Sequence, residues 1–127
     1  MVATGVLTGM LLFATDGLAA ANSIKITGPQ HVRVGASPKF VISGYSNAGR
    51  GVATYLDKRG CARTVAAEQN RSARKLLFDR RIHAGSFRFT DTIGHSVLGR
   101  HVICAYLYNR IKGAPTVRRA EFDYVTS

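Results

Sequence analysis

Apolar and polar residues alternate along most of the chain after residue 22, in short runs that end at glycine, proline or asparagine. An alternation with a period of two residues is typical of β-strands, whose successive side chains point to opposite faces. The pattern predicts seven or eight strands. The runs that predict them are 23–27, 31–34, 39–44, 51–57, 75–82, 87–93, 99–109 and 116–125.

The run 99–109 is apolar on both faces, which predicts a central strand covered on both sides. One face carries a cysteine and two tyrosines, and the other carries only aliphatic residues. The first face consists of Val102, Cys104, Tyr106 and Tyr108, and the second of Ile103, Ala105 and Leu107. In the last run, 116–125, we expect Ala120, Phe122 and Tyr124 to point inward.

Residues 64–73 break the β pattern, because they are rich in helix-forming residues and poor in β-branched ones. A short helix near residues 65–72 is expected there. An isolated helix of this length is marginal in water, so it needs support from neighbouring structure. We expect it to pack over an open end of the fold, beside Cys61.

The spacing of the strands, with no regular strand–helix–strand alternation, predicts an all-β fold: an antiparallel sandwich of two sheets with Greek-key connections. Residues 22–127 are enough for one such domain.

The first 21 residues have the pattern of a signal peptide. Residues 6–14 form an apolar run too short to span a membrane, and Ala19-Ala20-Ala21 fits an A-x-A cleavage site. No basic residue precedes the run, and Asp16 follows it, which is unusual; a start placed too late would explain the missing basic segment. The alternative is a buried helix, which three glycines in residues 5–17 disfavour. The expectation is a secreted or extracytoplasmic domain, 22–127, with no transmembrane segment in the mature chain.

The chain contains two cysteines, Cys61 and Cys104, which are 43 positions apart and form no metal-binding or redox motif. In an oxidising compartment they would most simply pair with each other. Such a bond would stabilise the fold by about 4 kcal/mol on the chain-entropy relation. The alternative, two free thiols in a cytosolic protein, conflicts with the expected signal peptide.

Three short motifs resemble secreted bacterial Ig-like domains of the kind common in actinobacteria. They are a Cys-x-x-Thr-x-Ala-x-Glu stretch at 61–68, a Gly-Ser-Phe turn at 85–87, and Gly-x-x-x-x-Cys-Ala-Tyr-Leu at 99–107. The resemblance covers about residues 39–124 and implies an Ig-like fold and export, but no particular chemistry. The chain has no tryptophan, and Cys61 follows the third or fourth strand, so the usual core disulfide of Ig domains is not expected.

The charge is strongly positive, with 18 Lys and Arg against 7 Asp and Glu, a net charge of +11. Such a charge attracts anionic partners, although it also simply keeps a secreted protein soluble. The planar guanidinium group of arginine can form two parallel hydrogen bonds to a phosphate or carboxylate group. The densest cluster of basic residues supplies the candidate anion-binding residues: Arg71, Arg74, Lys75, Arg80 and Arg81. No DNA- or RNA-binding motif is present.

Catalytic and cofactor signals are weak. The four histidines show no metal-ligand spacing, and a copper site at Cys104 and His101 would need an axial Met, whereas both Met residues lie in the expected signal peptide. Gly44-Tyr-Ser-Asn-Ala48 lacks the second glycine of a nucleophile elbow. The sequence therefore predicts no enzyme activity, no metal and no cofactor.

The resulting hypothesis is a monomeric, secreted binding or structural module that contacts anionic cell-surface or extracellular polymer through an Arg-rich face. The alternative is a carrier that holds a small ligand in a cleft of the sandwich. A small secreted hydrolase is a third class.

Overall fold

The computed structural model of the protein describes residues 21–72 and 74–127. All but the last residue of the expected signal peptide, 1–21, lies outside the described residues. Within them, no helix has the length and apolar character needed to cross a membrane.

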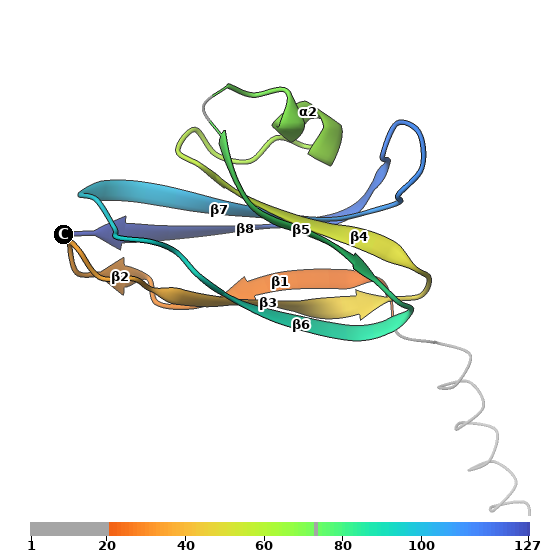
Figure 1. Ribbon diagram of the computed structural model, residues 1–127, viewed down its shortest axis with the longest axis horizontal. Coiled ribbons are helices and arrows are strands. Elements are labelled where there is room, and N and C mark those ends of the chain that lie inside the picture. The colour runs from red at the N-terminus through yellow and green to blue at the C-terminus, as the bar shows by residue number, and fades with distance from the viewer. Residues whose placement is uncertain (1–20, 73) are drawn as a thin grey trace, which may run out of the picture.

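Two β-sheets pack face to face, as the alternation predicts (Figure 1). One sheet has three strands in the order β1-β3-β6, and the other has five in the order β2-β8-β7-β4-β5. The described residues form eight strands and one short helix. Their bounds are β1 Ser23–Thr27, β2 His31–Val32, β3 Lys39–Ser46, β4 Arg50–Asp57, α2 Val65–Gln69, β5 Arg74–Ile82, β6 Gly85–Thr92, β7 Gly99–Tyr108 and β8 Thr116–Thr126.

Strand β7 is the central strand that the sequence predicts. Its residues 101–108 are all buried. Ile103 and Leu107 face the other sheet and join the main core, while Cys104 and Tyr106 belong to a second core on the outer face. The inward face expected of the last strand is confirmed as well, because Ala120, Phe122 and Tyr124 all contact the main core.

One pairing departs from the expected antiparallel sandwich. Strand β2 pairs with β8 in parallel, through His31 with Val125 and Val32 with Thr126. The reason is that β2 continues in the direction of β1 after the chain leaves the three-stranded sheet (Figure 1). At the edge of the second sheet, it then lies beside a strand that runs the same way.

The helix forms where expected but lies elsewhere than predicted. It covers the outer face of the five-stranded sheet, not an open end of the sandwich (Figure 1). Thr64 caps its first turn by accepting a hydrogen bond from the Ala67 amide at 3.1 Å. Val65 is fully buried in the second core with Tyr106. The apolar outer face of β7 needs a cover, and the helix supplies it.

We expect Gly44→Ala to destabilise the fold by about 1–3 kcal/mol through overpacking. A Cβ at this position would overlap the Ser23 carbonyl oxygen of the neighbouring strand and lie 2.8 Å from the Phe87 ring. Urea unfolding measures the effect. Gly49→Ala is the matched control, because its added Cβ would meet nothing closer than 3.6 Å. Equal midpoints for the two variants would contradict the prediction.

Candidate functional site

Three chain connections meet at one end of the sandwich, beside the start of β1 (Figure 1). They join β3 to β4, β5 to β6, and β7 to β8. In Ig-type sandwiches the loops gathered at one end are a common recognition surface, because the sheets hold them rigidly while their side chains stay free.

Arg50, the first residue of β4, is held in place at this end by neutral acceptors. Its Nε donates to Asn109 Oδ1 at 2.8 Å, and its Nη1 donates to Asn47 Oδ1 at 2.7 Å. The same Nη1 also lies 3.0 Å from Ser46 Oγ and 3.2 Å from Asn22 Oδ1. Among the described residues, no carboxylate is paired with this guanidinium. Its geometry is therefore fixed while its charge stays uncompensated.

A cavity of about 360 Å³ lies beside Arg50. Arg81 and His83, both exposed, also line it, together with Arg110. In the part of the chain that the structure describes, none of the lining residues carries a carboxylate. We call the set Arg50, Arg81, His83 and Arg110 the basic tip.

Arg110 is oriented by contacts on the outer face of the sheet. Its Nη1 lies 3.0 Å from the Tyr108 hydroxyl and 3.3 Å from Asp79 Oδ1. The Tyr108 hydroxyl in turn donates to Asp79 at 2.6 Å. Burial and then the Asp79 carboxylate raise the pKa of Tyr108 to about 12, so the phenol remains a donor at neutral pH.

A second depression of about 380 Å³ is lined by residues of β5 and β6, which are edge strands of the two sheets. We call this depression the edge groove. Arg80 and Arg88 line it, and the Arg80 guanidinium lies 5.5 Å from the centre of the Phe89 ring. Asp91 lies in the groove; burial raises its pKa, while nearby Arg80 acts in the opposite direction.

The five basic residues that the sequence selects are divided by the structure. Arg71 bonds to Asp57 Oδ2 at 3.2 Å and to the Gly60 carbonyl at 2.7 Å, and Arg74 bonds to the Gln69 carbonyl at 3.2 Å. These two arginines connect the helix segment to the sheet, and anion binding by them stays a prediction.

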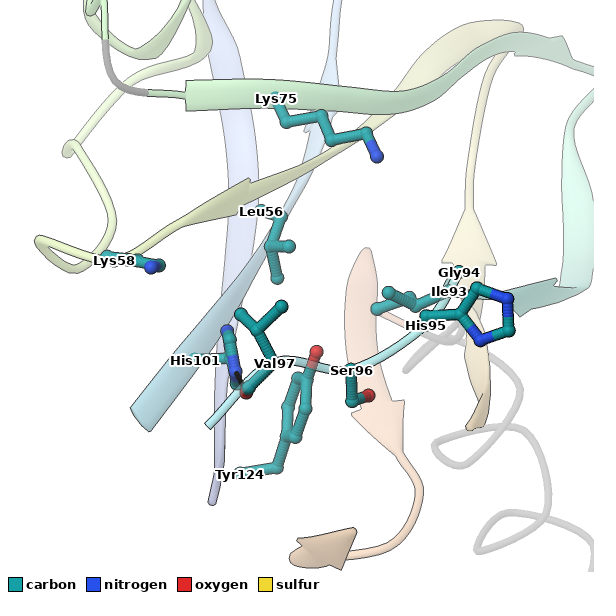
Figure 2. A pocket seen from close by; sticks show the side chains of 10 residues that line it. All are labelled: Leu56, Lys58, Lys75, Ile93, Gly94, His95, Ser96, Val97, His101 and Tyr124. Carbon is teal, nitrogen blue, oxygen red and sulfur yellow. Dashed lines mark hydrogen bonds between the residues drawn. The ribbon is translucent and has the colours of Figure 1, made fainter. Parts of the chain in front are cut away.

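The other three are exposed but lie apart. Arg81 belongs to the basic tip and Arg80 to the edge groove. Lys75 lines a separate pocket at the opposite end of the sandwich (Figure 2). Anion binding by these residues remains a prediction.

The sequence prediction omits Arg50, His83 and Arg110. The sequence does carry a signal for these residues. Where successive strands run in opposite directions, every second connection lies at the same end of the fold. The connections 47–49, 83–84 and 109–115 therefore had to meet. The orientation of Arg50 has no such signal, because its acceptors come from three separate segments.

Two buried carboxyl groups lie under the helix, where Asp57 and Glu68 are both 0% exposed. The Glu68 Oε1 atom accepts a hydrogen bond from the Ala62 amide at 2.9 Å and lies 3.1 Å from the Tyr106 hydroxyl. Burial and the neighbouring Asp57 raise the pKa of Glu68. Burial acts the same way on Asp57, but hydrogen bonds from Glu68, the Arg59 amide and Arg71 outweigh it and lower its pKa. Of the two carboxyl groups, Glu68 therefore holds a proton more readily than Asp57.

The predicted disulfide is confirmed. Cys61 and Cys104 are joined, with an S–S distance of 2.10 Å and Cα atoms 5.4 Å apart. The bond ties the loop after β4 to β7 on the outer face of one sheet, and does not cross the core between the sheets. In the described residues, no group of three or more His, Cys, Asp or Glu is arranged to hold a metal ion.

No protein-family model matches the chain, and no curated protein matches it by sequence. Solved structures do match. A CARDB domain from Pyrococcus furiosus, crystallised in complex with di-metal ions, is similar with a TM-score of 0.56 and 14% identity, covering 84% of this chain and 93% of that one. Its solution structure gives a TM-score of 0.55 and 13% identity, with 83% of this chain and 93% of that one covered.

A β-glucosidase from Listeria innocua is similar with a TM-score of 0.54 and 12% identity. The match covers 85% of this chain but 16% of the glucosidase. These identities are too low to carry function from one protein to the other, and they establish the fold. The described residues form an Ig-like β-sandwich with one short helix and one disulfide.

Proposed function

We propose that the protein is an extracytoplasmic binding module that holds anionic polymers at the basic tip. The observation that carries this proposal is Arg50, a half-buried guanidinium that is fixed by neutral acceptors and, among the described residues, is paired with no carboxylate. A guanidinium group that is already held in place and has no paired acid favours phosphate, sulfate or carboxylate groups. Little conformational entropy is lost when such a group binds to it.

The surroundings of Arg50 support a polymer over a single ion. Arg81 and Arg80 are consecutive in β5, and they face the tip and the edge groove respectively. Arg88 of β6 lines the edge groove together with Arg80. Basic residues in both depressions suit repeated charges along a polymer.

Export is the second part of the proposal. The disulfide supports an oxidising compartment, where such bonds persist. The pattern of residues 1–21 supports a signal peptide, and the lack of enzymatic activity stays a prediction from sequence.

The test is binding of a fluorescent inorganic polyphosphate to the oxidised protein, followed by anisotropy between 50 and 300 mM salt. We expect the affinity to fall steeply with salt, because bound counterions are released from each neutralised phosphate. Arg81→Ser should weaken binding. It should also reduce the slope of log affinity against log salt concentration by about 1, because one phosphate contact is lost. Arg50→Met should weaken it more, by about tenfold or above, since a charged hydrogen-bonded fork is lost.

Arg33→Ser is the matched control, because Arg33 is an exposed arginine in the loop after β2, at the opposite end of the sandwich. It removes the same charge from the whole protein but leaves the tip intact. If Arg33→Ser and Arg81→Ser weakened binding equally, the attraction would depend on net charge and the tip would not be a site. Absence of binding at 50 mM salt would also reject the proposal.

A further inference from the structure

The pocket that contains Lys75 lies between the two sheets at the end opposite the basic tip (Figure 2). We call it the lysine pocket. Its volume is about 200 Å³, or roughly seven water molecules at ~30 Å³ each. Leu56, Ile93 and Tyr124 belong to the main core or contact it, so the apolar interior of the sandwich is open at this point.

Within residues 21–72 and 74–127, two buried polar atoms of this pocket have no hydrogen-bond partner. They are Ser96 Oγ, in a residue 5% exposed, and His101 Nδ1, in a residue 3% exposed. His101 Nε2 lies 2.7 Å from the Val97 carbonyl, which can only accept, so Nε2 carries the proton in the neutral ring. Nδ1 is then an acceptor without a donor. Unpartnered buried polar atoms are rare in folded proteins and require an explanation.

Several side chains border the open space of the pocket, whereas the His95 ring points away from it (Figure 2). Figure 2 shows the Tyr124 hydroxyl pointing into the space from below, with Leu56 above it and Ile93 at the side. Burial raises the pKa of Tyr124, so its hydroxyl stays protonated at neutral pH. The floor therefore combines aliphatic walls with hydroxyl groups and one ring acceptor.

The mouth of the pocket is cationic. Lys58 and Lys75 both line it and are exposed, and within the described residues neither forms an ion pair. Lys75 is the cross-strand partner of Leu56, so its charge lies directly beside an apolar wall. Figure 2 shows its ammonium group extending above the open space.

We propose that the lysine pocket binds a small carboxylic acid with an apolar body and a hydroxyl group at its other end. The apolar body packs against Leu56, Ile93 and Val97, and the carboxylate meets the lysines at the mouth. The hydroxyl group bonds to the unpartnered polar atoms below. This site is separate from the basic tip and does not rest on the function proposed there.

The test is calorimetric titration of the oxidised protein with 4-hydroxyphenylacetate, with two analogues for comparison. Phenylacetate lacks the hydroxyl group, and 4-hydroxyphenylethanol lacks the carboxylate. We expect saturable 1:1 binding of the hydroxy acid and about tenfold weaker binding of each analogue, as for loss of one hydrogen bond to a charged or buried group. Lys75→Met should weaken the hydroxy acid by a similar factor and leave 4-hydroxyphenylethanol unchanged.

Val97→Trp should fill the pocket and abolish binding. Leu98→Trp is its matched control, because Leu98 is the next residue, is 72% exposed and does not line the pocket. Equal binding by the two variants, or no saturable binding by the parent protein, would overturn the proposal. Arg50→Met, which alters the basic tip, should bind the hydroxy acid as the parent does, so this result and the polyphosphate result are independent.

Discussion

Replacing both cysteines, in the variant Cys61→Ala/Cys104→Ala, is expected to lower the free energy of unfolding by about 4 kcal/mol. The bond closes a loop of 43 positions, and its loss lets the unfolded chain explore many more conformations. The loop contains β5, whose position on the edge of the sheet depends on β4 alone. Urea unfolding of oxidised parent and variant measures the difference.

Two controls separate loss of the bond from loss of packing, since Cys104 is fully buried. Reduced parent protein keeps both side chains and should lie close to the variant in stability. The m-value should rise when the bond is absent, because the unfolded state becomes more expanded. If the oxidised and reduced parent unfolded at the same urea concentration, the bond would contribute nothing and the prediction would fail.

The fold was largely predictable because burial and strand geometry act on short stretches of sequence. The alternation from Val102 to Tyr108 fixes which side chains share a face, whatever the strand pairs with. The pairing of Cys61 with Cys104 followed from there being no other cysteine. The position of the helix was missed, because alternation alone does not say which apolar face remains uncovered after the sheets pack.

The candidate site was less predictable, for a reason that β5 makes clear. A bulge opposite Thr54 and Tyr55 places an extra residue in β5. Lys75 then pairs with Leu56 and Arg80 with Val52, so two residues five positions apart lie on the same side of the sheet. Strict alternation would have put them on opposite sides. The set of basic residues that share a surface therefore depends on this bulge, which the alternation pattern does not predict.

The sequence also did not predict which arginines are paired with acidic side chains in the folded protein. Arg71 is bound by Asp57, 14 positions away, and Arg110 by Asp79, 31 positions away. By contrast, Arg50 is surrounded by asparagine and serine and keeps its charge. A basic residue becomes available to a ligand only when the fold gives it no acid, and that depends on tertiary contacts.

The second prediction with a large expected effect on stability concerns the buried carboxyl groups of Asp57 and Glu68. Asp57→Asn is expected to cost about 3 kcal/mol at pH 7, because removing one member of a buried charged network leaves its partners without their acceptor. Asp57 accepts hydrogen bonds from the Arg59 amide at 3.0 Å and from Arg71 at 3.2 Å. Its folded-state pKa is lowered, so this stabilisation is present above its ordinary pKa near 4 and is lost on acidification. The penalty of the variant should therefore shrink as the pH falls through that range.

Glu68→Gln tests the raised pKa of Glu68, since glutamine resembles the protonated carboxyl group. The pKa of Glu68 is raised by burial and by Asp57, so its stabilisation is full below about 4.5 and is lost as the pH rises through the raised value. Relative to the parent, the variant should gain stability as the pH rises above about 4.5, until the raised pKa of Glu68 is passed. Thermal unfolding across that range measures the trend, and Glu121→Gln, at an exposed glutamate of β8, is the control. A stability difference between Glu68→Gln and the parent that did not change with pH would show that folding does not raise the pKa of Glu68.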